Sequence, residues 1–385
     1  MNDRRHWENC ITHEDADAKQ FIRKYFTDQD RKCLLIGGAG FDPRSCTIAT
    51  QLSDALKTRL QAVFFREERP KADSQLKKAA DSNEAILRSN ISNINIEHID
   101  IFAEDQAAVG SVRAIRKLNE YYQDPTWLNG ITDVVLDMSA LSIGISYPIA
   151  RFLLEICEQT SSTSFHLMTA YNPDLDERIK SEPHDTVKKV HSFPSEHRFG
   201  EVTDDVNSGL VQEPARVWLP QLAENKLEVL NTIKASITDT YRVCPILPFP
   251  AQNPKAADRL IEKFTEALSD GWNVDTRDFL YVSERNPLDS FRRISDLKER
   301  YDRATDEIFD FEMVLSPLGS KVVSMGILLA AIKHDLTVKY VETLRYKLSV
   351  DQETQAANDG SSDNMVHVWL HGPIYDGYGK GKPAA

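Results

Sequence analysis

The sequence Gly-Gly-Ala-Gly-Phe-Asp-Pro-Arg-Ser at residues 37–45 has the composition of an anion-binding turn. Glycines allow positive φ angles and close approach of a ligand, and a helix N-terminus attracts negative charge. The candidate ligand-binding residues in this turn are Gly37, Gly38, Gly40, Asp42, Arg44 and Ser45. Their spacing matches neither the Rossmann fingerprint nor the P-loop. Two interpretations stay open, a phosphate or nucleotide cradle and an ordinary strand-to-helix turn with a capping side chain.

Acidic and hydroxyl residues follow three other apolar stretches. Glu67 lies just after residues 59–65, in the place where Rossmann-type sites hold a ribose hydroxyl. The alternative for this residue is a solvated charged turn. Asp137 ends another apolar stretch, and Ser139 and Ser142 follow it either as ligand donors or as helix caps. The candidate catalytic residues, as general bases or metal ligands, are Asp42, Asp137 and Glu284.

A second candidate anion site lies at residues 316–321. Its ligand-binding candidates are Ser316, Gly319, Ser320 and Lys321. Backbone N–H groups at a strand end, together with one ammonium group, can hold a phosphate. In the alternative, Ser320 caps the next helix and Lys321 points to water.

The elements that position these residues follow a strand-turn-helix order. Residues 33–36 and 132–138 are apolar without alternation, which is typical of strands covered on both faces. Further strands are expected at 59–65, 94–102 and 165–171, with helices between them. We therefore predict an α/β protein whose first Rossmann-like lobe, residues 1–171, has a mainly parallel sheet flanked by helices.

A second Rossmann-like lobe is expected at residues 216–350, with strands at 241–249, 279–282, 311–315 and 336–342. Residues 172–215 are polar and predict a long loop that carries His184, His191 and His197 on its surface. Residues 351–385 predict a flexible tail with one edge strand at 366–370. The two lobes share a pattern in which 33–36 corresponds to 243–246, and 132–138 to 311–315. A true duplication would place a cleft between two similar lobes, and chance similarity between α/β domains is the alternative.

Composition excludes several functions. The 385 residues carry a net charge of −13, which argues against non-specific nucleic-acid binding. Five scattered cysteines without CxxC spacing predict reduced thiols in a cytoplasmic protein, and no metal motif is present. The N-terminal residues lack the apolar segment of a signal peptide, and the longest apolar run, 322–332, is too short to span a bilayer.

Residues 316–321, the apolar helix after them and residues 337–341 resemble CARF and SAVED proteins, which are bacterial sensors of cyclic oligonucleotides. A SAVED domain consists of two fused CARF-like units, which is similar to the repeat described above. The resemblance covers residues 210–345, and residues 37–44 have no counterpart in it. It implies a nucleotide-binding sensor or accessory component of an antiviral defence system that works with a protein partner or as a homo-oligomer.

Two other hypotheses remain, namely an enzyme acting on a nucleotide or phosphosugar between the lobes, and a scaffold that binds a protein through residues 172–215.

Overall fold

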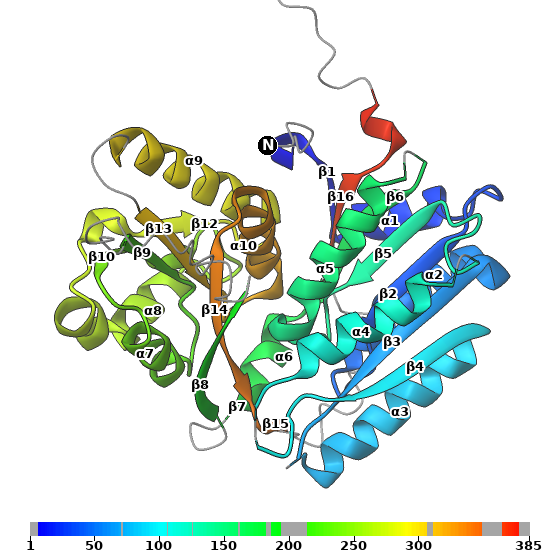
Figure 1. Cartoon of the computed structure of the whole chain (residues 1–385), viewed down its shortest axis with the longest axis horizontal. Helices are drawn as coiled ribbons and strands as arrows, with labels where there is room; N and C mark the ends of the chain where they lie inside the picture. Colours follow the sequence, from blue (N-terminus) through cyan, green and yellow to red (C-terminus); the bar gives the residue numbers. More distant parts are fainter. Residues whose placement is uncertain are drawn as a thin grey trace, which may run out of the picture. The chain divides into compact units, whose positions relative to one another are not determined.

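The computed structural model describes residues 7–70, 72–105, 107–124, 126–160, 162–181, 186–193, 214–305, 311–348 and 364–376. The chain divides into two compact units (Figure 1). Unit 1 comprises residues 1–8 and 173–349, and unit 2 comprises residues 9–172 and 350–385. Unit 2 is thus formed by two segments of the chain on either side of a long insertion. None of the described helices is both long and apolar enough to cross a membrane.

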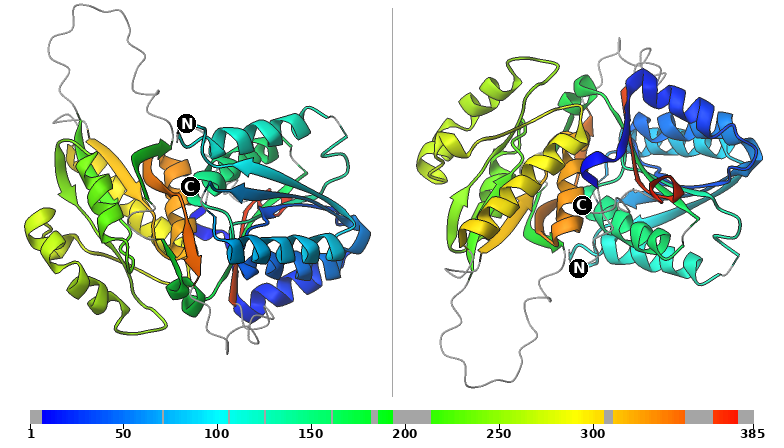
Figure 2. Two further views of the ribbon diagram at one scale, coloured as in Figure 1. Left: turned by 90° about the horizontal axis from the view of Figure 1, so that it is seen from below. Right: turned by 90° about the horizontal axis from the view of Figure 1, so that it is seen from above.

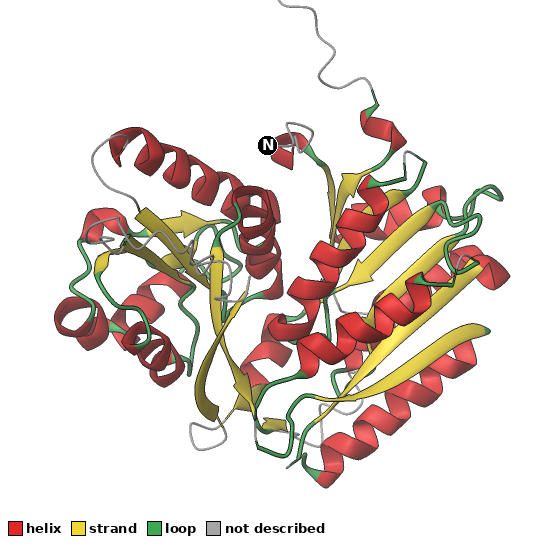
Figure 3. Cartoon of the chain, in the orientation of Figure 1, coloured by secondary structure: helices red, strands yellow, loops and turns green. Residues whose placement is uncertain are grey.

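Unit 2 contains, among its described residues, a seven-stranded sheet in the order β1-β16-β6-β5-β2-β3-β4. Its strands are drawn in yellow in Figure 3 and labelled in Figure 1. Its strands are β1 (Ile11–Glu14), β2 (Cys33–Gly38), β3 (Leu60–Glu68), β4 (Asn93–Asp100), β5 (Asp133–Asp137), β6 (Ser164–Tyr171) and β16 (Asn364–His371). The strands β2 to β6 are all parallel, and β16 is antiparallel to β6 and β1. The parallel strands have the order of a doubly wound dinucleotide-binding fold, which confirms the predicted α/β class.

Helices cover both faces of this sheet (Figure 2). One layer holds α1 (Asp15–Tyr25), α2 (Thr47–Leu56) and α3 (Ser74–Asn90), and the other holds α4 (Gly110–Tyr122) and α5 (Ile143–Glu158). Every residue of β2 is buried, because the strand lies in mid-sheet between the two layers. Leu35, Leu52 and Phe64 belong to one apolar core formed by β2, α2 and β3. This double cover explains why β2 and β5 lack polar alternation.

Unit 1 contains, where it is described, a five-stranded sheet in the order β10-β9-β13-β14-β8. Its strands are β8 (Thr186–Phe193), β9 (Ala215–Pro220), β10 (Thr240–Val243), β13 (Phe311–Ser316) and β14 (Thr337–Thr343). All pairs are parallel except β14 with β8. Two short strand pairs join β11 (Ile246–Pro248) to β12 (Leu280–Val282) and β15 (Tyr346–Leu348) to β7 (Ile179–Ser181). The helices are α6 (Pro173–Arg178), α7 (Leu227–Ala235), α8 (Ala256–Lys263), α9 (Pro287–Thr305) and α10 (Lys321–His334).

Three sequence predictions are wrong. The long loop expected at 172–215 contains α6, β7 and β8, and β8 pairs with β14. The single strand expected at 241–249 is two strands, β10 and β11, which belong to different sheets. The edge strand expected at 366–370 is β16, which lies inside the sheet between β1 and β6. His191 lies in β8 and is partly buried, whereas His184 and His197 lie outside the described residues.

The internal repeat needs one correction. The first parallel strand of each sheet along the chain has the next strand, β3 or β10, on one side and a later strand, β5 or β13, on the other, so β13 corresponds to β5 as expected. The counterpart of β2, however, is β9, not residues 243–246. No strand was predicted at the residues that form β9. The antiparallel strands β8 and β16 also occupy equivalent places.

Candidate functional site

The carboxyl ends of β2 and β5 form a topological switch point in unit 2. The two strands are parallel neighbours, and the helices that follow them, α2 and α5, lie on opposite faces of the sheet (Figure 2). Ligands of open α/β sheets bind at this position, because the diverging loops leave space outside the strand ends. The turn at residues 37–45 and the residues after Asp137 therefore meet at the place where this fold binds ligands.

The three glycines of the turn have different surroundings. A Cβ atom on Gly37 would lie 2.8 Å from Cε1 of Phe64, and one on Gly38 would lie 3.0 Å from the backbone of Ala140. These two glycines allow close packing within the protein. A Cβ atom on Gly40 would meet nothing within 4 Å. Gly40 is thus the glycine of the turn that borders open space.

Arg44 forms a buried ion pair with Asp42. Its Nε and NH2 atoms lie 3.0 and 2.7 Å from the two carboxylate oxygens, and the side chains are almost inaccessible. Asp42 also accepts a hydrogen bond from the backbone N–H of Arg44 and caps the 3-10 turn Pro43–Cys46. Asn83 of α3 donates to the carbonyl oxygens of Gly40 and Asp42. Ser45 is fully buried beside this pair. The turn is therefore held by its own side chains, and Arg44 binds a carboxylate of the protein.

The carboxyl of Asp137 at this site is incompletely hydrogen-bonded by the part of the chain that the structure describes. Its side chain is 1% exposed, and Oδ1 accepts hydrogen bonds from the backbone N–H and the hydroxyl of Ser139. Its Oδ2 is buried and has no hydrogen-bond partner among the described residues. Burial raises the pKa of Asp137 to about 7, with a smaller upward contribution from Asp42, against the hydrogen bonds from Ser139 and the charge of Arg44.

Two hydroxyl groups near the start of α5 are also without partners. The Oγ atoms of Ser142 and Ser146 are buried and make no hydrogen bond within the described part of the chain. They lie four residues apart, so both are on one side of the helix. The backbone N–H of Ser142 donates to Glu67 Oε1 over 2.7 Å, and Glu67 Oε2 pairs with Arg69. Glu67 thus binds the start of α5, and the hydroxyl of Ser139 donates to Asp137.

The second candidate turn, in unit 1, is filled by a protein side chain. The switch point of this sheet lies between β9 and β13. A Cβ atom on Gly319 would lie 2.5 Å from Nε2 of Gln221, and Gln221 is itself 4% exposed. Gln221 accepts a hydrogen bond from Ser324 and donates to the carbonyl oxygen of Ser320.

The remaining candidates of unit 1 have structural contacts. Ser316 is fully buried and its hydroxyl accepts a hydrogen bond from the indole N–H of Trp218. Ser320 precedes α10, and its side chain makes no capping hydrogen bond. Lys321 is the first residue of that helix and is partly buried. Glu284 accepts a hydrogen bond from the backbone N–H of Gln252, so it holds the turn before α8.

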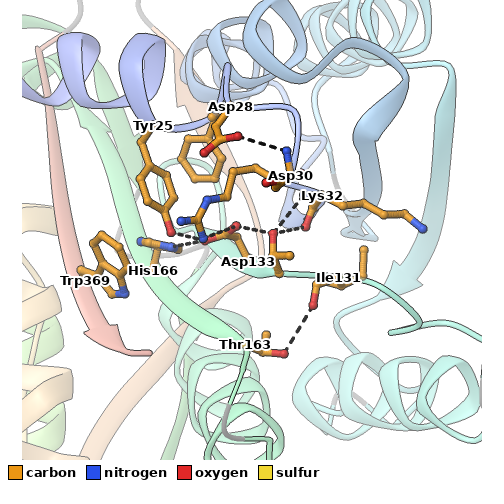
Figure 4. Close-up of polar contacts among 12 residues, drawn as sticks. Tyr25, Asp28, Asp30, Lys32, Ile131, Asp133, Thr163, His166 and Trp369 are labelled. Carbon is orange, nitrogen blue, oxygen red and sulfur yellow. Dashed lines mark hydrogen bonds and ion pairs between the residues drawn. The ribbon is translucent and has the colours of Figure 1, made fainter. Parts of the chain in front are cut away.

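The sequence analysis missed a buried polar cluster at the opposite end of β5 (Figure 4). Asp133 is fully buried and lies 3.1 Å from Nε2 of His166, and the hydroxyl of Tyr25 donates to the same carboxylate oxygen. The sequence does contain a signal for this cluster, because Asp133 and His166 are polar residues inside strands that are otherwise apolar. No group of three or more metal-ligating side chains is found among the described residues.

Comparisons with known proteins add little to this geometry. No protein family and no curated protein matches the sequence. Among solved structures, the chain is similar to a "Crystal structure of UDP-N-acetylglucosamine 2-epimerase", with 10% sequence identity over 74% of this chain and 73% of that chain. The TM-score is 0.22, and at this value the similarity carries no argument about function.

Proposed function

We propose that unit 2 binds a nucleotide-like ligand at the carboxyl ends of β2 and β5. The observation that carries this proposal is the buried carboxyl of Asp137, whose Oδ2 has no partner in the described protein. A buried polar atom without a hydrogen bond is costly, so a group that supplies one gains affinity. The open side of Gly40 offers the approach that such a ligand needs.

The chemistry of the site suits the hydroxyl, amino or amide groups of a nucleoside better than a bare phosphate. Arg44 and Arg69 are each paired with a carboxylate, so their charge is already balanced. Among the described residues of this site, the buried polar atoms without a hydrogen-bond partner are Oδ2 of Asp137 and the hydroxyls of Ser142 and Ser146. A carboxyl with a pKa near 7 can accept or donate a hydrogen bond at neutral pH.

Thermal unfolding of the full chain with a compound panel tests this proposal. The panel holds nucleosides, nucleotides, cyclic oligonucleotides, phosphosugars and inorganic phosphate. A ligand present at 100 times its Kd should stabilise unit 2 by about 2.7 kcal/mol. We expect a nucleoside or nucleotide to raise the melting temperature and inorganic phosphate alone to have no effect. Absence of any shift across the panel would contradict the proposal.

Gly40→Leu is the sharpest variant, because a Cβ atom at this position has no neighbour within 4 Å and the longer side chain extends into that open space. It should keep the melting temperature of the free protein and abolish the ligand-dependent rise. Gly271→Leu is the matched control, because a Cβ atom there has its nearest neighbour at 4.0 Å and the residue belongs to unit 1. Equal ligand binding by Gly40→Leu and the control would place the ligand elsewhere.

A second candidate function is an enzyme that acts on a nucleotide or phosphosugar. The observation in its favour is the pKa of Asp137 at about 7, since a proton-transfer group works best near the operating pH. Turnover of a panel compound, lost in Asp137→Asn while ligand binding is retained, would support catalysis. Unchanged turnover in that variant would exclude Asp137 from the chemistry.

The wider biological role is also proposed. Sensing within a bacterial defence system, with a separate protein partner or as a homo-oligomer, is supported by the resemblance at residues 316–321 and 337–341. A cytoplasmic location is supported by the five cysteines, none of which forms a disulfide. Size-exclusion chromatography with and without the ligand from the panel tests ligand-dependent assembly, and an unchanged elution volume would count against it.

A further inference from the structure

We propose that His13, His367, His166 and Asp133 form a proton-binding relay, in which one proton taken from solvent at His13 is shared along the chain without breaking any of its contacts. All four residues belong to unit 2. The relay is at the opposite end of β5 from Asp137, and it does not depend on the ligand site.

The relay is a continuous row of short contacts across four neighbouring strands. Nδ1 of His13 in β1 lies 2.9 Å from Nδ1 of His367 in β16. Nε2 of His367 lies 2.9 Å from Nδ1 of His166 in β6. Nε2 of His166 lies 3.1 Å from Oδ1 of Asp133 in β5. His166, His367 and Asp133 are buried, whereas His13 is partly exposed, so solvent reaches the row at His13.

The direction of the hydrogen bonds follows from the carboxylate at the inner end. An ionised Asp133 only accepts, so His166 donates from Nε2 and has its lone pair on Nδ1. His367 must then donate from Nε2 and accept at Nδ1, and His13 must donate from Nδ1. In this arrangement all three rings are neutral, and Nε2 of His13 is the ring nitrogen that still has a lone pair outside the row.

Counting protons gives the capacity of the relay. Each of the three contacts needs one hydrogen, and three neutral rings supply three. A fourth proton binds Nε2 of His13 and every contact keeps its single hydrogen. If the hydrogens then shift along the row, the charge moves from His13 to His166, where it pairs with Asp133. A fifth proton on a ring nitrogen would put two hydrogens into one contact and break it, so the three rings together accept one proton and not two.

The surroundings keep the three histidine rings of the relay neutral at pH 7. Burial lowers the pKa of His367, His166 and His13, although Asp133 opposes this for His166 and Asp17 opposes it for His13. Phe21 stacks on the rings of His13 and His367. Other titratable or charged groups that face the row come from α1, the loop after it, β2 and α5, and they are Tyr25, Arg31, Cys33 and Cys157.

NMR of the full chain with labelled histidine rings tests the relay directly. At pH 8 we expect the Nδ1–H tautomer for His13 and the Nε2–H tautomer for His367 and His166. On acidification, the three rings should respond with one common midpoint below pH 6.5 and take up one proton in total while unit 2 stays folded. Three independent midpoints, or a different tautomer of His367, would overturn the proposal without any variant.

His13→Gln removes the solvent end of the relay and keeps an N–H that can donate to His367. In this variant, we expect the common midpoint to disappear and His166 to stay neutral until the unit unfolds. His98→Gln is the control, because His98 lies on β4 and its side chain is 48% exposed in an ion-pair cluster with Glu68 and Glu84. Unchanged titration of His166 in His13→Gln would overturn the assignment of His13.

Discussion

Asp133 and Asp137 occupy the two ends of β5 and have pKa values shifted in opposite directions. They are four residues apart, so both side chains lie on one face of the strand, roughly 13 Å apart along it. Both are buried, which alone would raise each pKa. Hydrogen bonds from His166, Thr132 and Tyr25 outweigh burial and lower the pKa of Asp133, whereas burial outweighs Ser139 and raises the pKa of Asp137. One strand therefore carries a charged aspartate and one that is half neutral near pH 7.

The raised pKa of Asp137 predicts a pH-dependent loss of stability. A carboxyl whose folded pKa lies above its unfolded value stabilises the fold below about pH 4 and loses that contribution as pH rises through about 7. Asp137→Asn removes the ionisation, so this variant should be more stable than the parent at pH 8 by on the order of 3–4 kcal/mol and similar to it at pH 4. Urea unfolding at the two pH values measures this. An equal difference at both values would contradict the assignment.

The glycines of the turn should differ in their tolerance of a methyl group. Gly38→Ala brings a Cβ atom against the backbone of Ala140, so β2 and the loop after β5 must separate, at a cost of about 1–3 kcal/mol. Gly40→Ala should change the free energy of unfolding by less than about 0.5 kcal/mol, because its Cβ atom meets nothing. Thermal unfolding of the two variants compares them, and equal melting temperatures would refute the difference in packing.

Gly319→Ala should destabilise unit 1 through Gln221. The added methyl group displaces the Gln221 amide and breaks its buried hydrogen bond with Ser324, which costs about 1–3 kcal/mol. In a Gln221→Ala background the same change should cost nearly nothing, because the obstructing side chain is gone. A double-mutant cycle by urea unfolding measures the difference. Additive effects would show that Gln221 does not fill this switch point.

Unit 2 should lose stability in mild acid. The pKa values of His367 and His166 are lower in the folded state than in the unfolded chain, so the unfolded chain binds more protons below about pH 6.5. Above that pH the neutral, buried histidines impose no cost on folding. As the pH falls toward the folded pKa values, the free energy of unfolding declines, because the unfolded chain takes up the protons more readily. Urea unfolding midpoints at pH 7.5 and 5.5 should therefore differ in that direction in an Asp137→Asn background, because the raised pKa of Asp137 gives the parent chain an opposite pH dependence over this interval. His98→Gln should show the same difference, since His98 is exposed.

Local patterns were enough to predict most elements of the fold. The non-alternating runs at β2 and β5 identified a parallel sheet, because a strand covered on both faces has no polar side. Residues 241–249 were misassigned because the pattern did not show that the chain leaves one sheet at Cys244 and Pro245 and enters another at Ile246. The place of β16 was unpredictable from local signals, since its partner β6 is about 200 residues away in sequence.

The sequence predicts where residues of the candidate site lie in the fold, but not which side chains they contact. Asp137 and the turn at 37–45 lie at the switch point because strand order alone puts them there. The sequence could not show that Arg44 pairs with Asp42, or that Glu67 caps α5, since both depend on side-chain geometry. The relay joins residues up to 354 positions apart, so no local pattern reports it.

The position of β16 has a consequence for synthesis on the ribosome. Strand β1 precedes the 173–349 segment, yet its hydrogen-bonding partner β16 is translated only after the whole of that segment. Until β16 is translated, the edge of β6 that pairs with it has no partner strand, and β1 has no strand to pair with. The nascent sheet is thus open along one side until β16 is translated. Strand β16 then completes the sheet by pairing with β1 on one side and β6 on the other.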